Sequence, residues 1–107
     1  MNTNFEGMLD ATMLPIGQAF VHTENDAYHR KLMCTVIANF MEQFKDAGAI
    51  TTYAIRCDDE MNNEDVIKNH ELRYAVALKH PGQDEFTLYE YQAAREFQGD
   101  INGNGND

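Results

Sequence analysis

Residues 49–91, AITTYAIRCDDEMNNEDVIKNHELRYAVALKHPGQDEFTLYEY, decide the fold because three stretches within them alternate apolar with polar or small side chains. A period of two places successive side chains on opposite faces of a strand, as a sheet covered on one face requires. The first stretch starts at Thr51, and the others are residues 72–79 and 85–91. The side chains assigned to one face of the first two stretches are Tyr53, Ile55, Cys57, Leu72, Tyr74, Val76 and Leu78.

The two connections between these stretches carry different turn signals. Residues 58–65 hold five acids and no base, and Asn62-Asn63 favours a turn because asparagine bonds its own backbone. A single helical turn is expected over residues 64–69. The second connection, His80 to Asp84, contains Pro81-Gly82 and has a common hairpin length. We therefore predict that residues 72–79 and 85–91 form an antiparallel hairpin.

Upstream, residues 25–46 repeat apolar side chains at intervals of three and four, which predicts a long amphipathic helix. Either Thr23 or Asn25 is expected to cap its start, and Gly48 is expected to end it in a left-handed conformation. The side chains assigned to its buried face are Tyr28, Leu32, Met33, Val36, Ile37, Phe40, Met41 and Phe44, and those assigned to the opposite face include Arg30, Lys31 and Glu42.

The first residues predict a short helix over 4–14, with Phe5, Met8, Leu9, Thr12 and Met13 near one face. Pro15 and Gly17 are expected to stop it, and residues 19–22 are expected to be extended. The resulting fold class is α+β, with a long helix packed on a small, mainly antiparallel sheet of three strands. We predict a single domain over residues 1–91 and a polar tail or arm over residues 92–107.

The charge balance excludes several classes of partner. Eighteen acidic and eight basic side chains give a net charge of -10, which disfavours nucleic acids and anionic membranes. The longest apolar run, residues 74–78, is far shorter than the roughly 20 residues of a membrane helix.

No lysine or arginine precedes Arg30, so we expect no secretory signal. A chain that stays in the reducing cytoplasm is expected to keep Cys34 and Cys57 as buried, unpaired thiols.

The residues capable of chemistry form no recognisable catalytic set. The histidines, His22, His29, His70 and His80, lack the short spacings of zinc ligands. Neither cysteine has a histidine and an orienting carboxylate assigned to it, and both are interpreted as small packing residues. We expect no enzyme activity and no cofactor.

Two acidic stretches raise the question of a calcium site. Oxygen ligands occur at Asp58, Asp59, Glu60, Asn62 and Asp65, but a solvated turn is the favoured interpretation. In the tail, Asp100, Asn102, Asn104 and Gly105 match four early positions of a calcium-binding loop. The twelfth-position glutamate is missing, so no complete loop of this kind forms, and we predict no metal site.

A further pattern is an ordered set of positions, namely Phe20, Asn25-Asp26, Cys57-Asp58, Asn62-Asn63, Ile67, Leu72, Pro81 and Phe86. In these positions and in its order of elements, the chain resembles the C-terminal domain of phage tail sheath proteins. The resemblance covers about residues 20–91. It implies a structural virion protein located in the tail and made in the host cytoplasm. It also implies a sheet completed by terminal arms of neighbouring subunits, because an unpaired strand edge offers backbone donors and acceptors.

The resemblance predicts a sheath-like ring or collar component that binds itself and other tail proteins. The side chains expected to take part in assembly are Phe5, Tyr53, Ile55, Phe86, Leu88, Phe97 and Ile101. The alternative is a small acidic adaptor or regulatory protein that binds a single protein partner through its acidic turn and helix. Copy number separates the two, since a ring component forms a closed oligomer and an adaptor stays monomeric or binds one to one.

Overall fold

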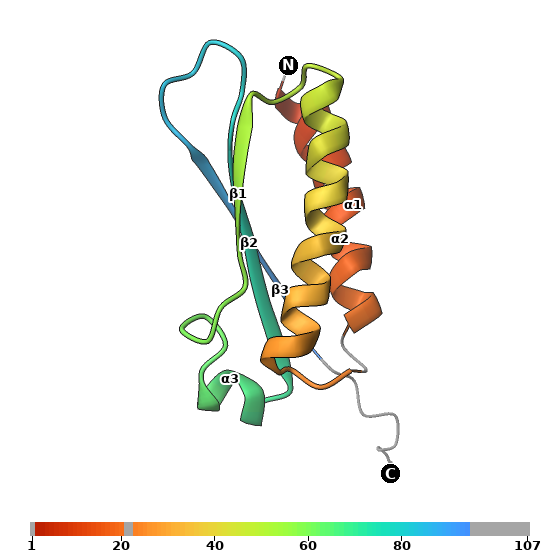
Figure 1. Ribbon diagram of the computed structural model, residues 1–107, viewed down its shortest axis with the longest axis vertical. Coiled ribbons are helices and arrows are strands. Elements are labelled where there is room, and N and C mark those ends of the chain that lie inside the picture. Colours follow the sequence, from red (N-terminus) through yellow and green to blue (C-terminus); the bar gives the residue numbers. More distant parts are fainter. Residues whose placement is uncertain (1, 21–22, 95–107) are drawn as a thin grey trace.

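The computed structural model describes residues 2–20 and 23–94 and shows two long helices on one face of a three-stranded sheet (Figure 1). The strands lie in the order β1-β2-β3, and both neighbouring pairs are antiparallel. The predicted α+β class is confirmed. The elements are α1 (Asn2–Phe20), α2 (Ala27–Asp46), β1 (Thr52–Arg56), α3 (Glu64–Lys68), β2 (Glu71–Lys79) and β3 (Thr87–Ala94).

The register of the sheet separates a helix-covered inner face from an outer face. Tyr53 pairs with Leu78, and Ile55 pairs with Val76, which in turn pairs with Tyr89. Directly paired residues share a face, so these side chains point together toward the helices. The largest fully buried side chains of the core are Leu9, Met13, Met33, Ile37, Met41, Ile50, Tyr74, Val76 and Leu78.

Helix α1 is longer than predicted, because it continues through Pro15 and Gly17 to Phe20. Proline inside a helix removes one backbone hydrogen bond, but Pro15 itself faces solvent. Met13 and Ile16, on either side of it, are both buried in the core. Packing of this continuous apolar stripe therefore overrides the local stop signal. Residues 19 and 20, expected to be extended, are helical, and residues 21–22 lie outside the described residues.

The start of α2 is capped by Asp26, so the prediction of Thr23 or Asn25 was wrong. The Asp26 carboxylate accepts a hydrogen bond of 2.9 Å from the His29 backbone N–H. At the other end Gly48 has a φ of 83°, the left-handed conformation predicted for it. The helix thus ends where its spacing indicated, while Asn25 is available for contacts with the sheet.

The buried face of α2 is rotated from the predicted one. Its buried residues are Arg30, Met33, Ile37 and Met41, although Arg30 was assigned to the polar side. Tyr28, Leu32 and Phe40, which were assigned to the core, are 66%, 41% and 37% exposed. Met8 of α1 was likewise assigned to a buried face and is exposed. The difference in α2 arises because Arg30 reaches polar partners at the end of the sheet.

The predicted hairpin is present, with β3 two residues later than expected at its start and three residues longer at its end. Gly82 in the connecting loop has a φ of 85°, as a turn glycine can. The predicted helical turn corresponds to α3, which Asn63 caps by accepting a hydrogen bond from the Val66 backbone N–H. Within the part of the chain that is described, no helix combines the length and apolar character needed to cross a membrane.

Candidate assembly surfaces and the polar cluster

The sheet has two open edges among the described residues. The central strand β2 is paired on both sides, so β1 and β3 each have one side without a strand partner in residues 2–20 and 23–94. These edges are five and eight residues long, respectively. An open edge presents a row of backbone N–H and C=O groups that an extended segment can pair with.

The outer face of the sheet carries a small apolar patch. The register places Ala54, Ala77 and Leu88 in one row across the three strands. Leu88 is 58% exposed, and both helices lie on the opposite face of the sheet (Figure 1). Beside this row, the exposed Phe86 ring lies 5.0 Å from the Lys79 ammonium nitrogen. We call Ala54, Ala77, Phe86 and Leu88 the outer patch.

The predicted assembly residues differ in where they lie in the structure. Phe86 and Leu88 are exposed on the outer patch. Tyr53 and Ile55 lie on the inner face of β1 and are half-buried, and the Tyr53 hydroxyl donates to Glu42 of α2 at 2.6 Å. Phe5 is buried in the core of the same chain, with its ring 5.4 Å from that of Phe44. Phe97 and Ile101 lie outside the described residues.

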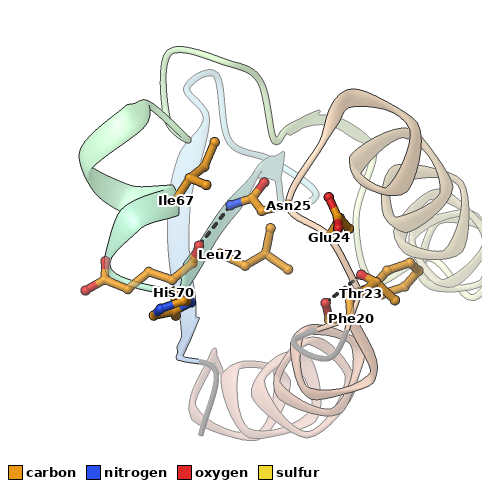
Figure 2. A pocket seen from close by; sticks show the side chains of 8 residues that line it. Phe20, Thr23, Glu24, Asn25, Ile67, His70 and Leu72 are labelled. Carbon is orange, nitrogen blue, oxygen red and sulfur yellow. Dashed lines mark hydrogen bonds between the residues drawn. The ribbon is translucent and has the colours of Figure 1, made fainter. Parts of the chain in front are cut away.

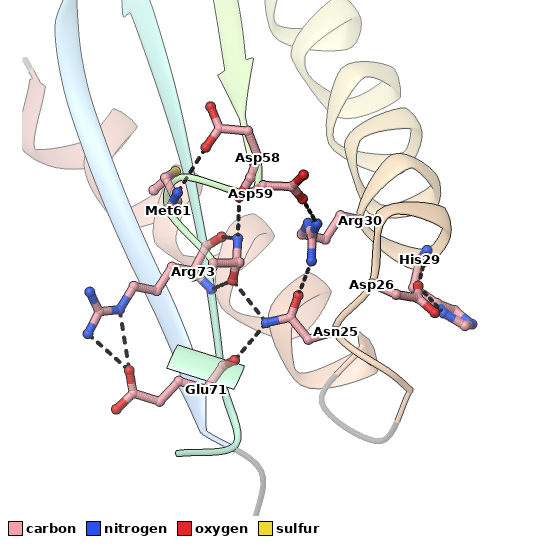
Figure 3. Close-up of polar contacts among 10 residues, drawn as sticks. Asn25, Asp26, His29, Arg30, Asp58, Asp59, Met61, Glu71 and Arg73 are labelled. Atoms are coloured by element: carbon pink, nitrogen blue, oxygen red, sulfur yellow. Dashed lines mark hydrogen bonds and ion pairs between the residues drawn. The ribbon is translucent and has the colours of Figure 1, made fainter. Parts of the chain in front are cut away.

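Two asparagines organise a polar cluster at the end of the sheet, which Figure 3 shows. Asn62 is 2% exposed and makes a hydrogen bond of 2.9 Å to the Arg73 carbonyl and one of 2.8 Å from the Arg73 N–H. The Asn25 amide donates to the Asn62 side-chain oxygen at 3.0 Å and to the Glu71 carbonyl at 2.8 Å. These bonds join the segment before α2, the turn before α3 and the start of β2.

Arg30 extends this polar cluster into the side of α2. It is 6% exposed and donates to Asn25 Oδ1 at 2.6 Å, and it pairs with the Asp59 carboxylate. A buried charge is stable only when it is paired and hydrogen-bonded. Arg30 meets both conditions because the helix presents it to the acidic turn, which explains why a charged side chain takes a core position.

The acidic turn is largely paired within the chain. Asp58 accepts from Arg56 at 2.8 Å and from the Met61 backbone N–H at 2.9 Å, and Glu60 also pairs with Arg56. Hydrogen bonding to Arg56, followed by that to Met61, lowers the pKa of Asp58. The described residues contain no group of three or more His, Cys, Asp or Glu side chains arranged to hold a metal ion.

A hollow of about 200 Å³ lies beside the polar cluster (Figure 2). Its wall includes Leu72, which is buried, and His70, whose φ of 61° is left-handed. The Thr23 hydroxyl donates to the Phe20 carbonyl at 2.7 Å across one side. Its lining residues are Phe20, Thr23, Glu24, Asn25, Ile67, His70, Glu71 and Leu72. The space is a narrow seam where the end of α1 meets α3 and β2.

The remaining candidates for chemistry take structural positions. His29 Nδ1 lies 2.8 Å from the Asp26 carboxylate at the start of α2. The His80 ring packs edge-on against Phe5, with Nδ1 3.3 Å from the Ala49 carbonyl. His22 lies outside the described residues. Cys34 and Cys57, which are far apart in the sequence, line one common hollow between α2 and the end of β1.

Comparison with known proteins adds one relationship. No protein-family model matches the chain, and no solved structure matches it. Over 88 residues the chain is 25% identical to the tail sheath protein of Salmonella phage ViI. The match covers 82% of this chain and 14% of that protein, so the chain spans about one seventh of the relative's length. The chain is thus distantly similar to a segment of a phage tail sheath protein.

Proposed function

We propose that this chain is a structural component of a phage tail. The observation that carries the proposal is the similarity to a tail sheath protein, which extends over 88 residues and most of this chain. The match includes only 14% of the relative, so the larger protein's whole role does not transfer. The part proposed for this chain is a sheath-like unit in a ring, a collar or a short sheath.

The proposed route of assembly is strand addition at the open edges of β1 and β3. An extended segment from a neighbouring copy or another tail protein pairs its backbone with such an edge, while alternate side chains contact the neighbour. We assign the donated segment to residues 95–107, with Phe97 and Ile101 as its apolar contacts. The net charge of -10 makes copies repel each other, so moderate salt is expected to favour assembly by screening.

The contacts of the acidic turn support this proposal over a single-partner adaptor. Such an adaptor would present the acids of residues 58–60 to a basic partner. In this chain Asp58 and Glu60 pair with Arg56, and Asp59 pairs with Arg30. Each of these acids thus already has a basic partner within the chain, although the three side chains stay 50–89% exposed. The edges of the sheet, in contrast, are not paired within the described residues.

The mass of the assembled species tests the proposal. We expect light scattering of the full chain to show closed oligomers that increase with concentration and with moderate salt. A variant lacking residues 95–107 is expected to keep the same circular dichroism spectrum but to lose the oligomer. A full chain that stays monomeric throughout would contradict the proposal, and equal assembly of both forms would exclude residues 95–107 as the donated segment. Residues 1–6 are unsuitable for deletion because Phe5 belongs to the core.

A second pair of variants tests whether the outer patch contributes to the interface. Leu88→Glu and Gln92→Glu place the same new charge on the same face of β3, at two exposed positions. Leu88→Glu is expected to weaken assembly, because it puts a carboxylate into the apolar row, and Gln92→Glu is expected to assemble as the unmodified chain does. Equal behaviour of the two variants would show that assembly does not use the outer patch.

A further inference from the structure

Cys34 and Cys57 are neighbours in space although one lies on α2 and the other directly follows β1. Both line a hollow of about 280 Å³, together with the cations Arg30 and Lys31 and the carboxylates Asp58 and Asp59. Cys57 is 6% exposed and belongs to the core, whereas Cys34 is half-buried at its margin. Both are free thiols. Cys34 is consequently the member of the pair that a small reagent in solvent reaches first.

The two thiols differ in acidity because they interact with each other. Hydrogen bonding with Cys57 lowers the pKa of Cys34 to about 7, against the opposing effect of burial, and the positive charge of Arg30 adds to the lowering. Hydrogen bonding with Cys34, together with burial, raises the pKa of Cys57. Cys34 is therefore the thiol of the pair that ionises first. A thiolate with a pKa near the ambient pH combines high abundance with good nucleophilicity.

The polar cluster holds the cation beside this pair in place. Arg30 is buried and fixed by the Asn25 oxygen and the Asp59 carboxylate. It lines the same hollow as both cysteines. The positive charge next to the thiols is thus a built feature of the fold, one turn of α2 before Cys34.

We propose that Cys34 and Cys57 form a peroxide-reactive dithiol that closes to a disulfide between α2 and the end of β1. The Cys34 thiolate attacks one oxygen of hydrogen peroxide, the O–O bond breaks, and hydroxide leaves, so that Cys34 becomes a sulfenic acid. Cys57 then loses its proton and attacks the Cys34 sulfur, and the sulfenic hydroxyl leaves as water. In total, two thiols lose two hydrogen atoms and one peroxide becomes two water molecules.

This disulfide would link the helix layer to the sheet. A covalent bond between distant parts of a chain restricts the unfolded state, so the oxidised protein is expected to unfold at a higher temperature than the reduced one. The inference rests on the position and acidity of the two thiols and is independent of the proposed role in a phage tail.

Peptide mapping of the full, reduced chain after treatment with hydrogen peroxide provides the test. Cleavage after Lys31, Lys45, Arg56 and Lys68 separates residues 32–45 from residues 57–68, and each peptide contains one cysteine. After denaturation and alkylation, we expect these peptides to be joined, with a mass lower by two hydrogen atoms than the sum of the reduced pair. The reaction is expected to be about tenfold faster at pH 8 than at pH 6, because the thiolate reacts.

Two variants assign the steps. Cys57→Ser is expected to stop at the sulfenic acid of Cys34, which a cyclic 1,3-diketone traps, and Cys34→Ser is expected to leave Cys57 unmodified. The proposal is wrong if the methionines of the unmodified chain are oxidised while peptides 32–45 and 57–68 stay separate. It is equally wrong if the disulfide joins two chains, or if a folded Cys34→Ser variant reacts as fast as the unmodified chain. The peptide map of the unmodified chain tests the proposal even where a variant fails to fold.

Discussion

The two faces of the sheet differ in what they contact. On the inner face Tyr74, Val76 and Leu78 are completely buried beneath α1 and α2. On the outer face Leu88 is 58% exposed, and Ala54 and Ala77 lie beside it without helix cover. The inner face therefore holds the chain together, while the outer face and the two strand edges leave apolar and backbone groups available to other molecules.

This contrast indicates how a small chain can serve as a building unit. Its stability comes from one layer of helix-to-sheet packing, closed at one end by the polar cluster around Asn25 and Asn62. Its proposed contacts with neighbours use none of these side chains. A substitution can then abolish assembly without unfolding the chain, or unfold it without touching an assembly surface.

Truncating one leucine on each face provides the largest expected difference. Leu78→Ala should lower the free energy of unfolding by about 2–5 kcal/mol, because it removes buried surface and leaves a cavity. Leu88→Ala should change it by less than about 0.5 kcal/mol, since Leu88 already contacts solvent. Urea titration of both variants measures the two costs. Similar costs would mean that the outer face is covered in the isolated chain.

A pair of glycines in α1 tests how closely this helix approaches the inner face. A Cβ atom at Gly17 would overlap the buried Tyr74 hydroxyl, which donates to the Met13 carbonyl at 2.7 Å, whereas a Cβ at Gly7 meets nothing within 4 Å. Gly17→Ala should therefore destabilise the chain, toward the upper end of about 1–3 kcal/mol. Gly7→Ala should stabilise it by up to about 1 kcal/mol through helix propensity. If thermal unfolding showed that Gly17→Ala and Gly7→Ala shift the unfolding temperature in the same direction, this packing would be contradicted.

The smallest effect is expected at the rim of the inner face. The Tyr91 hydroxyl donates to the Asp10 carboxylate of α1 at 2.7 Å, and burial, followed by this hydrogen bond, raises the pKa of Tyr91. Tyr91→Phe should cost about 1 kcal/mol. Tyr28→Phe is the control, because Tyr28 is 66% exposed, and it should be close to neutral. If Tyr91→Phe and Tyr28→Phe had the same urea midpoint, the hydrogen bond between Tyr91 and Asp10 would contribute nothing to stability.

The strands were predictable because local pattern and tertiary packing agree in them. Leu72, Tyr74, Val76 and Leu78 alternate along β2, and all four are buried on the inner face. The end of α1 was not predictable, since Pro15 is a local stop signal, whereas Ile16 beyond it is buried in the core that the helices share with the sheet. Predictions from neighbouring residues fail where packing against a distant part of the chain provides the stabilising free energy.

The buried face of α2 was missed for a related reason. Spacing alone assigned Phe40 to the core and Arg30 to solvent, because it weighs each side chain by its own polarity. In the structure Arg30 pairs with Asp59, 29 positions away in the chain, and the buried stripe passes through Met33, Ile37 and Met41. A basic residue at core spacing, together with an acidic turn elsewhere, was the signal available in the sequence.

The thiol pair shows the same limit for sites. Cys57 continued the covered face of Tyr53 and Ile55, and Cys34 lay at the margin of the helix face. Their meeting could follow only from knowing that the first half of α2 lies beside the end of β1. The polar cluster is also only partly predictable. The sequence places Asn62 in a turn, but it does not show that this side chain is buried and hydrogen-bonded to the Arg73 backbone.

Quantitative mass spectrometry of particles purified from cells that produce this chain would examine the proposed role itself. We predict that the chain is present in many copies per tailed particle, in a fixed ratio to the tail proteins, as a symmetric component requires. Its absence from such particles, with normal amounts in the cell, would contradict a structural role in the tail.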